Sequence, residues 1–430
     1  MVAPDAVGPG GREHPLRILL FSQHFWPESF RINDVAQSLQ AAGHRVTVLT
    51  GQPNYPGGTV FDGYRAAACV VEPYRGVQIH RVPLLPRGRG GALRLAANYL
   101  SFIASAATCG AWRLRGQRFD VVFVYATSPL LQALAAIVLA RLKSCPLVVW
   151  VQDLWPQSLQ VTGYVRHPRL LAAVERVVRL VYARCTLLLV QSPAFVEPVR
   201  ALAPPHVPVR VHANPGDDEV PVDAPPALQL EPGFNAVFAG NLGTAQALDT
   251  VLDAAERLRD LPDLRIVLVG SGSRSAWLAE QVRARALGNV QLPGRFAPEQ
   301  MPGILAQAQA LLLTLKDDPA MALTVPSKLQ SYFAAGRPVV AAIGGEGARL
   351  VREAGAGIAC APGDAAALAA ALRSLHALGP AERERLGAAG RRCHAEQFSP
   401  RVLTPALLAH LQSAVDAARD HGDNTAADRR

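Results

Sequence analysis

LRILLFS (residues 16–22) is a short, continuously apolar run, which is typical of a parallel strand that is covered on both faces. A helical pattern follows, with Ile32 and Val35 on one side, and Gly43 ends it. RVTVLTG (45–51) is the next strand-like run. The same alternation recurs at FDVVFVY (119–125), CPLVVWVQ (145–152) and CTLLLVQS (185–192). This rhythm predicts a doubly wound α/β domain.

A proline-rich segment between Pro198 and Gly233 interrupts the rhythm and leaves only VPVRVHA (207–213) as a possible last strand. Apolar runs then resume at NAVFAG (235–240), LRIVLVG (264–270), QALLLTL (309–315) and RPVVAAI (337–343). We therefore expect an α/β fold of two doubly wound, Rossmann-like domains whose sheets face a central cleft with their carboxyl ends. The boundaries that we predict are a flexible N-terminus (1–15), a first domain (16–212), a linker (213–232), a second domain (233–398), a C-terminal helix (399–418) and a disordered tail (419–430).

Composition limits the classes of protein that fit. Of the 430 residues 50% are hydrophobic and 18% are charged, so each domain can bury a core. The net charge of +9 suits nucleic acid, an anionic membrane or a phosphate-bearing substrate, and charge alone does not choose among them. Six scattered cysteines without a C-x-x-C pair indicate reduced, buried thiols and no zinc site. We find no secretory signal and no uncharged run long enough to span a membrane, and we expect a cytoplasmic protein.

The most informative motif is VPSKLQSYFAAGRPVV (325–340). A loop with Lys328 leads into a short helix, which Gly336 and Pro338 close before the next strand. Pro-Ser-Lys, then an aromatic residue and Ala-Ala-Gly-Arg-Pro-Val-Val, resembles the nucleotide-sugar site of family 4 of the retaining glycosyltransferases. Within that family the motif is most similar to the exopolysaccharide and O-antigen group that includes the colanic acid enzymes.

Further stretches resemble the same group in the same order. They are FSQHFWPESFRIND (21–34), GHRVTVLTGQPNYPGG (43–58), VVWVQDLWP (148–156) and FAGNLGTAQALDTVLDAA (238–255), so the likeness spans about residues 16–400. The resemblance implies the GT-B fold and transfer of a sugar, with retention, from a nucleoside-diphosphate sugar to a glycan or a polyprenyl-linked acceptor in cell-surface polysaccharide biosynthesis. It implies no nucleic-acid partner.

The departing nucleoside diphosphate needs positive charge, from a metal or from fixed cations. The chain has no Asp-x-Asp pair for a metal, so we expect a metal-independent site without a cofactor. Lys328 and the backbone amides of the turn 240–243 are the candidates for the diphosphate. The alternative is that Lys328 is a solvated surface lysine and that the glycines only make turns.

The predicted donor-binding residues are Gly240, Asn241, Gly243, Gln246, Gly270, Gly272, Arg295, Pro326, Ser327 and Ser331. Gly270 and Gly272 either let the backbone approach the base or ribose or only turn the chain. Arg295 either touches the nucleotide or pairs with Glu299. The family's Glu-x7-Glu pair is Leu323 and Ser331 here, and its basic pair after the first strand of the second domain is Asn241 and Gln246.

The remaining candidates lie in the first domain. Gln152 stands where family members often have a histidine, and it can hydrogen-bond the sugar but cannot act as a base. Together with Lys328, we assign Gln152 and Asp153 to the catalytic site, although Asp153 fits a helix cap equally well. His24 and Glu28 are expected on the acceptor side; the alternative is that Glu28 pairs with Arg31 and that His24 is a satisfied hydrogen-bonding residue.

Residues 87–115 combine arginines with apolar residues, which fits either an anionic membrane surface or an ordinary core-facing helix. Two rival functions fit the fold. One is a sugar-nucleotide 2-epimerase, which would turn over the donor without an acceptor. The other is a non-catalytic scaffold subunit, which the substitutions at Gln152, Leu323 and Ser331 suggest.

Overall fold

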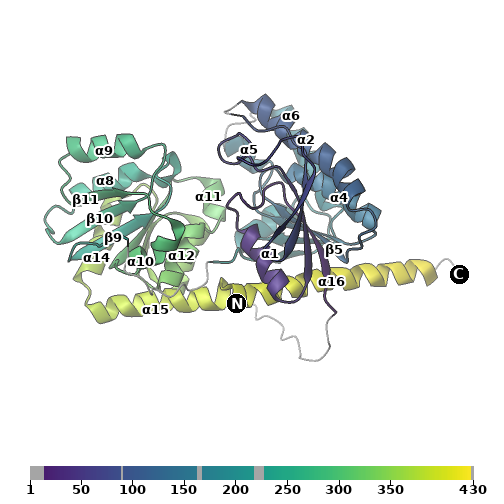
Figure 1. Cartoon of the computed structure of the whole chain (residues 1–430). Helices are drawn as coiled ribbons and strands as arrows, with labels where there is room; N and C mark the ends of the chain where they lie inside the picture. Colours follow the sequence, from purple (N-terminus) through teal and green to yellow (C-terminus); the bar gives the residue numbers. More distant parts are fainter. Residues whose placement is uncertain (1–13, 89–90, 162–166, 217–226, 428–430) are drawn as a thin grey trace. The chain divides into compact units, whose positions relative to one another are not determined.

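The computed structural model describes residues 14–88, 91–161, 167–216 and 227–427 (Figure 1). The strands are β1 (Arg17–Phe21), β2 (Arg45–Gly51), β3 (Val70–Tyr74), β4 (Val77–Val82), β5 (Val121–Ala126), β6 (Leu147–Val151), β7 (Leu187–Val190), β8 (Val209–Val211), β9 (Phe234–Ala239), β10 (Leu264–Val269), β11 (Val290–Gly294), β12 (Ala310–Thr314), β13 (Val339–Ala342) and β14 (Gly357–Cys360).

The α-helices are α1 (Ile32–Ala41), α2 (Ala92–Ser105), α3 (Ala111–Arg113), α4 (Ala133–Lys143), α5 (Gln157–Val161), α6 (Pro168–Tyr182), α7 (Val196–Arg200), α8 (Leu248–Glu256), α9 (Ser275–Ala284), α10 (Met301–Leu305), α11 (Pro319–Leu323), α12 (Ser327–Ala335), α13 (Gly345–Ala354), α14 (Ala365–Ala377), α15 (Pro380–Gln397) and α16 (Pro400–Ala427). Short 3-10 or π-helical segments lie at Ala106–Gly110, Leu130–Gln132, Pro193–Phe195, Thr244–Gln246 and Pro298–Gln300.

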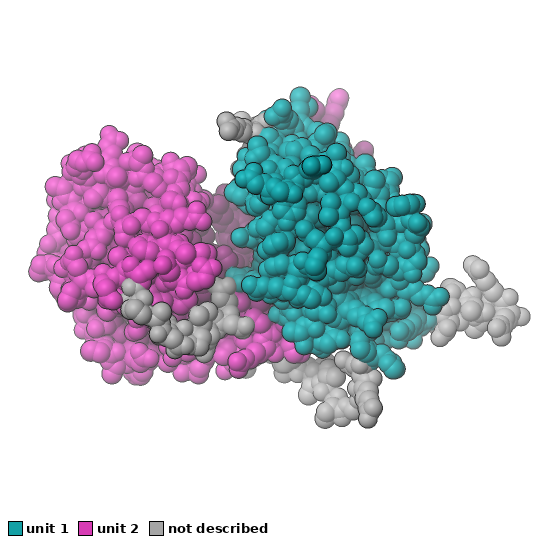
Figure 2. Space-filling model, viewed as in Figure 1, with its two compact units in different colours: residues 1–149, 183–187, 408–430 teal, residues 150–182, 188–407 magenta. Residues whose placement is uncertain are grey.

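The described chain divides into two compact units (Figure 2). Unit 1 comprises residues 1–149, 183–187 and 408–430, and unit 2 comprises residues 150–182 and 188–407. The continuous domain ranges that we derive from the sequence remain a prediction.

The first sheet has the strand order β3-β4-β2-β1-β5-β6-β7-β8 among the described residues. Pairs such as β1–β2 and β1–β5 are parallel, and only the edge strand β3 is recorded as antiparallel, to β4. Strands such as β5 and β6 are buried along their whole length, because helices cover both faces of a parallel sheet. The predicted last strand is present as β8.

The second sheet has the order β11-β10-β9-β12-β13-β14 in the described part of unit 2, and its recorded pairs are parallel. One apolar core packs α8 and α14 against one face, around Phe238 and Leu252. A second core packs α10, α12 and α13 against the other face, around Tyr332 and Phe333. These layers are visible in the left-hand lobe of Figure 1. The predicted fold class, two Rossmann-like α/β sheets, is therefore confirmed.

Three details differ from the sequence-based expectations. The helix α16 continues to Ala427, past the predicted end at residue 418, because no proline follows Pro405 to break it. All six cysteines are free, but only Cys185 and Cys393 are buried. Cys109 is exposed because it lies on the outward side of the π-helical turn Ala106–Gly110. The N-terminal residues 1–13, the linker residues 217–226 and the tail residues 428–430 lie outside the described residues.

None of the helices in the described ranges combines the length and the apolar character that crossing a membrane requires.

Candidate functional site

Two glycine turns meet at the carboxyl ends of β9 and β10. Gly240 and Gly270 both have positive φ angles, 138° and 146°. A Cβ atom on Gly270 would lie 1.8 Å from the carbonyl oxygen of Gly240, and one on Gly272 would lie 2.5 Å from the carbonyl oxygen of Leu242. The amide of Leu242 donates to the Ser271 carbonyl at 2.9 Å. The turns therefore need glycine for their own packing, and a role of these glycines in donor binding stays a prediction.

Lys328 lies in the first turn of α12 and reaches this glycine turn. Its ammonium donates to Oε1 of Gln246 and lies 3.9 Å from the centre of the Phe238 ring. A Cβ atom on Gly240 would lie 2.6 Å from Cε of Lys328. Burial lowers the pKa of Lys328 to about 7. Lys328 is therefore not a freely solvated surface lysine, and that alternative was wrong.

Neighbouring strands hold the lysine and its partner in place. The Gln246 carbonyl accepts a hydrogen bond from Oγ1 of Thr314 at 2.6 Å, which ties the turn to the end of β12. On α12, the hydroxyl of Tyr332 accepts from the amide of Ala239 at 2.9 Å and donates to the carbonyl of Leu312 at 3.2 Å. Burial raises the pKa of Tyr332, so this hydroxyl stays protonated. The helix that carries Lys328 is thus fixed to the two central strands.

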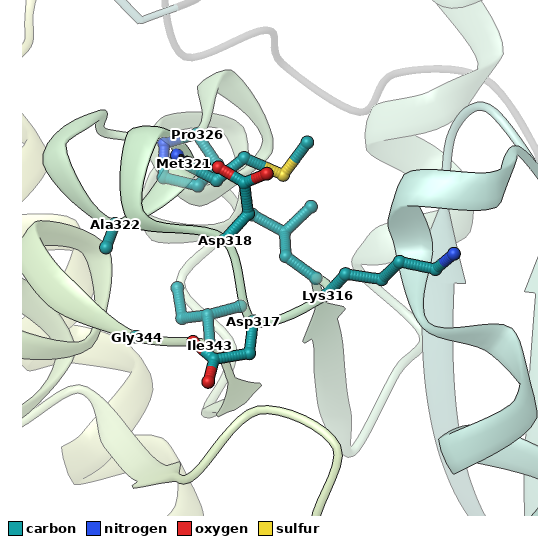
Figure 3. A pocket seen from close by; sticks show the side chains of 9 residues that line it. Lys316, Asp317, Asp318, Met321, Ala322, Pro326, Ile343 and Gly344 are labelled. Atoms are coloured by element: carbon teal, nitrogen blue, oxygen red, sulfur yellow. Dashed lines mark hydrogen bonds between the residues drawn. The ribbon is translucent and has the colours of Figure 1, made fainter. Parts of the chain in front are cut away.

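An open, shallow hollow lies beside α12 (Figure 3). It is lined by Leu315, Lys316, Asp317, Asp318, Met321, Ala322, Pro326, Ile343 and Gly344. Asp318 caps α11 by accepting from the amides of Ala320 and Met321 at 2.8 and 3.2 Å. Figure 3 shows the Lys316 side chain extending away from the other labelled side chains. Of the lining residues only Pro326 was predicted as donor-binding. Residues 315–318 and 343–344 could have been found because they directly follow β12 and β13, whereas Met321 and Ala322 lie on α11.

Gln152 lies in a group of buried amide side chains. It is 7% exposed, and its Oε1 accepts from Nδ2 of Asn214 at 2.8 Å. Its backbone carbonyl accepts from Nε2 of Gln191 at 2.7 Å. Gln191 and Asn214 were not predicted. Gln191 lies near the end of the predicted run 185–192, as Gln152 does in the run 145–152, and Asn214 follows the run 207–213.

On the predicted acceptor side, in unit 1, His24 and Glu28 form a buried pair. Nδ1 of His24 and Oε2 of Glu28 are 2.8 Å apart, and both side chains are at most 3% exposed. The other oxygen of Glu28 accepts from the amides of Asn54 and Tyr55 at 2.7 and 2.6 Å. Both oxygens of Glu28 are thus used, and among the described residues it forms no ion pair with Arg31, which lies 3.6 Å from Asp34. His24 is a satisfied hydrogen-bonding residue, as the alternative expected. Glu28 instead fixes the loop that follows β2.

The other predicted residues are placed as follows. Arg295 is exposed, and no ion pair with Glu299 is formed in the described structure. Ser327 is exposed at the start of α12, and Ser331 is half-buried one turn later. A Cβ atom on Gly243 would lie 2.7 Å from Nδ2 of Asn241. Asp153 is half-buried next to Gln152, and its role stays a prediction.

Leu323, at the position of the family's first glutamate, uses its backbone carbonyl to accept from Oγ of Ser192 at 2.8 Å. Within the described ranges no group of three or more His, Cys, Asp and Glu side chains could hold a metal ion. The expectation of a metal-independent site remains a prediction.

Two family models, both of glycosyltransferases, match successive parts of the chain. A family model described as a glycosyl transferase 4-like domain matches residues 29–215, and one described as glycosyl transferases group 1 matches residues 233–377. The two matches follow one another and together cover most of the chain. The chain belongs to the GT-B glycosyltransferases.

This GT-B glycosyltransferase is similar over short stretches to curated proteins. It is 35% identical over 100 residues to WcaI of Escherichia coli strain K12, which is named for glycosyl transfer in colanic acid biosynthesis. The aligned stretch covers 23% of this chain and 24% of WcaI. It is 30% identical over 142 residues to glycogen synthase of Mycobacterium tuberculosis strain H37Rv. This alignment covers 32% of this chain and 33% of that protein. These alignments span only a quarter to a third of the relatives' lengths.

Solved structures agree in fold over nearly the whole length of this GT-B glycosyltransferase. HepE of Anabaena, in complex with UDP-glucose, has a TM-score of 0.64 at 15% identity, covering 93% of this chain and 100% of HepE. The UDP-forming α,α-trehalose-phosphate synthase of Burkholderia vietnamiensis has a TM-score of 0.71 at 15% identity, covering 94% of this chain and 98% of the synthase. At such identities the likeness concerns the fold alone.

Proposed function

We propose that this protein transfers a sugar, with retention, from a nucleoside-diphosphate sugar to a glycan or polyprenyl-linked acceptor in cell-surface polysaccharide biosynthesis. The observation that carries the proposal is Lys328. Its ammonium lies against the Gly240 turn, at the strand ends where open parallel sheets bind ligands. The names of the sequence relatives, which include a colanic acid enzyme, support the choice of pathway class.

The diphosphate is the group that this arrangement suits. The amides of the turn 240–243 can donate to phosphate oxygens, and Lys328 supplies a cation that is partly buried and hence weakly screened. In the protein as described, Lys328 is satisfied only by a neutral amide and an aromatic face. A bound diphosphate would stabilise its protonated form and would gain a charge-assisted hydrogen bond.

The proposed reaction needs no protein nucleophile. The acceptor hydroxyl oxygen bonds to the anomeric carbon on the face from which the diphosphate leaves, and the carbon–oxygen bond to the phosphate breaks. The electron pair departs with the diphosphate, whose oxygen takes the acceptor proton. Lys328 stabilises the growing negative charge, and Gln152 hydrogen-bonds the sugar. The hollow beside Pro326 is the place that we propose for the sugar, because it adjoins the helix that carries Lys328.

On the acceptor side we propose His24 and Glu28 as the residues that shape the site. Glu28 fixes the loop at Asn54 and Tyr55, and His24 stacks at 5.1 Å on the ring of Phe30.

We further propose that the outer surface of α2 rests on an anionic membrane, where a polyprenyl-linked acceptor would be found. Leu93 and Leu100 are 88% and 62% exposed, and their spacing of two helical turns places them on one face. Trp112 is 60% exposed and lies under the guanidinium of Arg115 at 3.9 Å. The opposite side of α2 is core-facing, since Phe102 is fully buried. The core-facing interpretation therefore holds for the Phe102 side of α2, and the membrane contact that we propose concerns the opposite, exposed side.

The activity test is transfer from a panel of nucleoside-diphosphate sugars with Lys328→Ala and, as control, Arg283→Ala. Arg283 is an exposed basic residue on α9 of the same unit and does not line the hollow. We expect Lys328→Ala to lower kcat by about 100-fold or more, as for loss of one preorganised charge-stabilising group, and Arg283→Ala to change it by less than about twofold.

Equal activity of Lys328→Ala and the wild type would refute the site. Donor turnover that does not depend on acceptor would indicate the epimerase instead. Binding of donor without any turnover would indicate the scaffold subunit.

A further inference from the structure

Three neighbouring strands of the first sheet, β6, β7 and β8, each end in an amide side chain. Gln152 directly follows β6, Gln191 directly follows β7, and Asn214 comes shortly after β8. Nδ2 of Asn214 donates to Oε1 of Gln152 at 2.8 Å and to Oε1 of Gln191 at 3.2 Å. The three side chains therefore form one hydrogen-bonded group.

The partners of Asn214 leave it only one orientation. Both of its contacts are amide oxygens, so only its NH2 group can face them, and its two hydrogens serve both bonds. Gln191 is fixed in turn, because its Nε2 donates to the backbone carbonyl of Gln152. Since Oε1 of Gln152 faces Asn214, Nε2 of Gln152 must point away from this group.

Two atoms of the group remain without a partner among the described residues. They are Nε2 of Gln152 and Oδ1 of Asn214, and both are buried. Burying a polar atom without a hydrogen bond is costly, so such atoms are rare and need an explanation. Nε2 of Gln152 is a donor, and a hydroxyl oxygen of a sugar can accept a hydrogen bond from it.

The group is also connected to the helix that carries Lys328. Nε2 of Gln330 donates to the backbone carbonyl of Asn214 at 2.7 Å. Gln330 lies on α12, two residues after Lys328, and is 2% exposed. Asn214 is thus placed by the helix that reaches the glycine turn, and it in turn places Gln152.

We propose that Asn214 is a positioning residue that holds the Gln152 carboxamide in one orientation, so that Nε2 of Gln152 donates to a hydroxyl oxygen of the transferred sugar. The inference rests on the proposed glycosyl transfer and adds to it. It assigns Asn214 and Gln191 to the site, and it identifies the sugar as one that presents a hydroxyl oxygen to Gln152.

A double-mutant cycle on the full chain tests the proposal. Gln152→Ala, Asn214→Ala and the double variant are compared in kcat and KM for the donor. We expect each single variant to lose about tenfold in kcat/KM, the worth of one hydrogen bond to substrate. We expect the double variant to be no worse than Gln152→Ala, because Asn214 acts only through Gln152. Binding of UDP, used as the nucleotide probe, should change by less than about twofold in all three, since no amide of the group is assigned to the diphosphate.

Asn214→Asp separates positioning from simple packing. Aspartate has nearly the same shape but would face the oxygens of Gln152 and Gln191 with an acceptor, so we expect it to be at least as inactive as Asn214→Ala. If Asn214 only fills space, Asn214→Asp should be close to wild type. The matched control is Asn289→Ala in the same unit, because the Asn289 carboxamide likewise donates through Nδ2, here to the backbone carbonyl of Ala255 at 2.9 Å, and likewise has a buried Oδ1 without a hydrogen-bond partner among the described residues. We expect it to retain full activity.

The outcomes are distinguishable. Suppose that the wild type is active and the losses in kcat/KM of the two single variants multiply in the double variant, or that the Asn214→Asp variant is active. Either result would overturn the positioning role and leave the transferase proposal intact. A wild type without turnover of any donor would overturn the transferase proposal, and the positioning role would fall with it.

Discussion

The pKa of Lys328 predicts how donor binding should depend on pH. Burial lowers this pKa to about 7, so below pH 7 the free protein already carries the ammonium and binding gains little from further acid. Above pH 7 Lys328 of the free protein is mostly neutral. Binding of a diphosphate is then coupled to protonation of Lys328, and this protonation costs free energy. We expect the Kd of a nucleoside-diphosphate sugar to rise with pH above 7, by at most about tenfold per pH unit.

Lys328→Arg is the control for this pH dependence, because arginine stays protonated throughout the range. Titration calorimetry with UDP-glucose at several pH values would measure both proteins. A wild-type Kd that stays flat above pH 7, or an equal slope in the arginine variant, would contradict the assignment of the titrating group to Lys328.

At the residue scale, the sequence identified site residues through the separate motifs that contain them, and not through their contacts. Lys328, Gly240 and Gln246 were all named beforehand, and the structure brings them together. Gln191 and Asn214 were not named, because their contact with Gln152 depends on the order of β6, β7 and β8 in the sheet. Strand order is set by tertiary packing and cannot be read from the residues that flank each strand.

At the element scale, the placement of α12 can be tested through Tyr332. Tyr332→Phe removes the hydroxyl that satisfies the buried amide of Ala239, which should cost about 1–3 kcal/mol in the free energy of unfolding of unit 2. Because α12 also carries Lys328, we expect donor KM to rise. Phe333→Leu on the same helix is the control: it should lower Tm by lost packing but keep the hydrogen bonds, and so leave KM nearly unchanged. A Tyr332→Phe variant with unchanged Tm and KM would contradict this role.

The elements that the sequence predicted and those that it missed differ in their burial pattern. β9, β10, β12 and β13 were predicted because they are continuous apolar runs that the sheet buries on both faces. β4 was missed because His80 and Arg81 interrupt its apolar pattern, although both are buried and Arg81 is held by hydrogen bonds. β14 was missed because it has only four half-buried residues, too few for a periodic signal.

At the scale of the whole molecule, the net charge of +9 is unevenly distributed along the chain. Residues 73–119 contain no aspartate or glutamate and many arginines, and the exposed Leu93, Leu100 and Trp112 lie within this segment. The overall charge alone did not distinguish a membrane from other anionic partners. Apolar and aromatic side chains that are exposed among arginines favour a lipid surface, because nucleic acid offers no apolar phase in which to bury leucine.

Co-sedimentation with vesicles tests this surface. We expect the protein to bind phosphatidylcholine vesicles that contain phosphatidylglycerol, to bind pure phosphatidylcholine far less, and to dissociate as salt is raised. Replacing Arg87, Arg89 and Arg94 together by alanine should lower partitioning into the vesicles by roughly 100-fold, because each arginine near an anionic surface contributes about 1 kcal/mol.

Replacing the exposed leucines of α2, Leu93→Ser with Leu100→Ser, should also weaken binding to the vesicles. The control is Leu142→Ser, since Leu142 is 64% exposed on α4, outside residues 87–115, and its replacement should have no effect. Equal loss with Leu142→Ser, or full binding by the triple arginine variant, would discard the membrane role while leaving the donor site untouched.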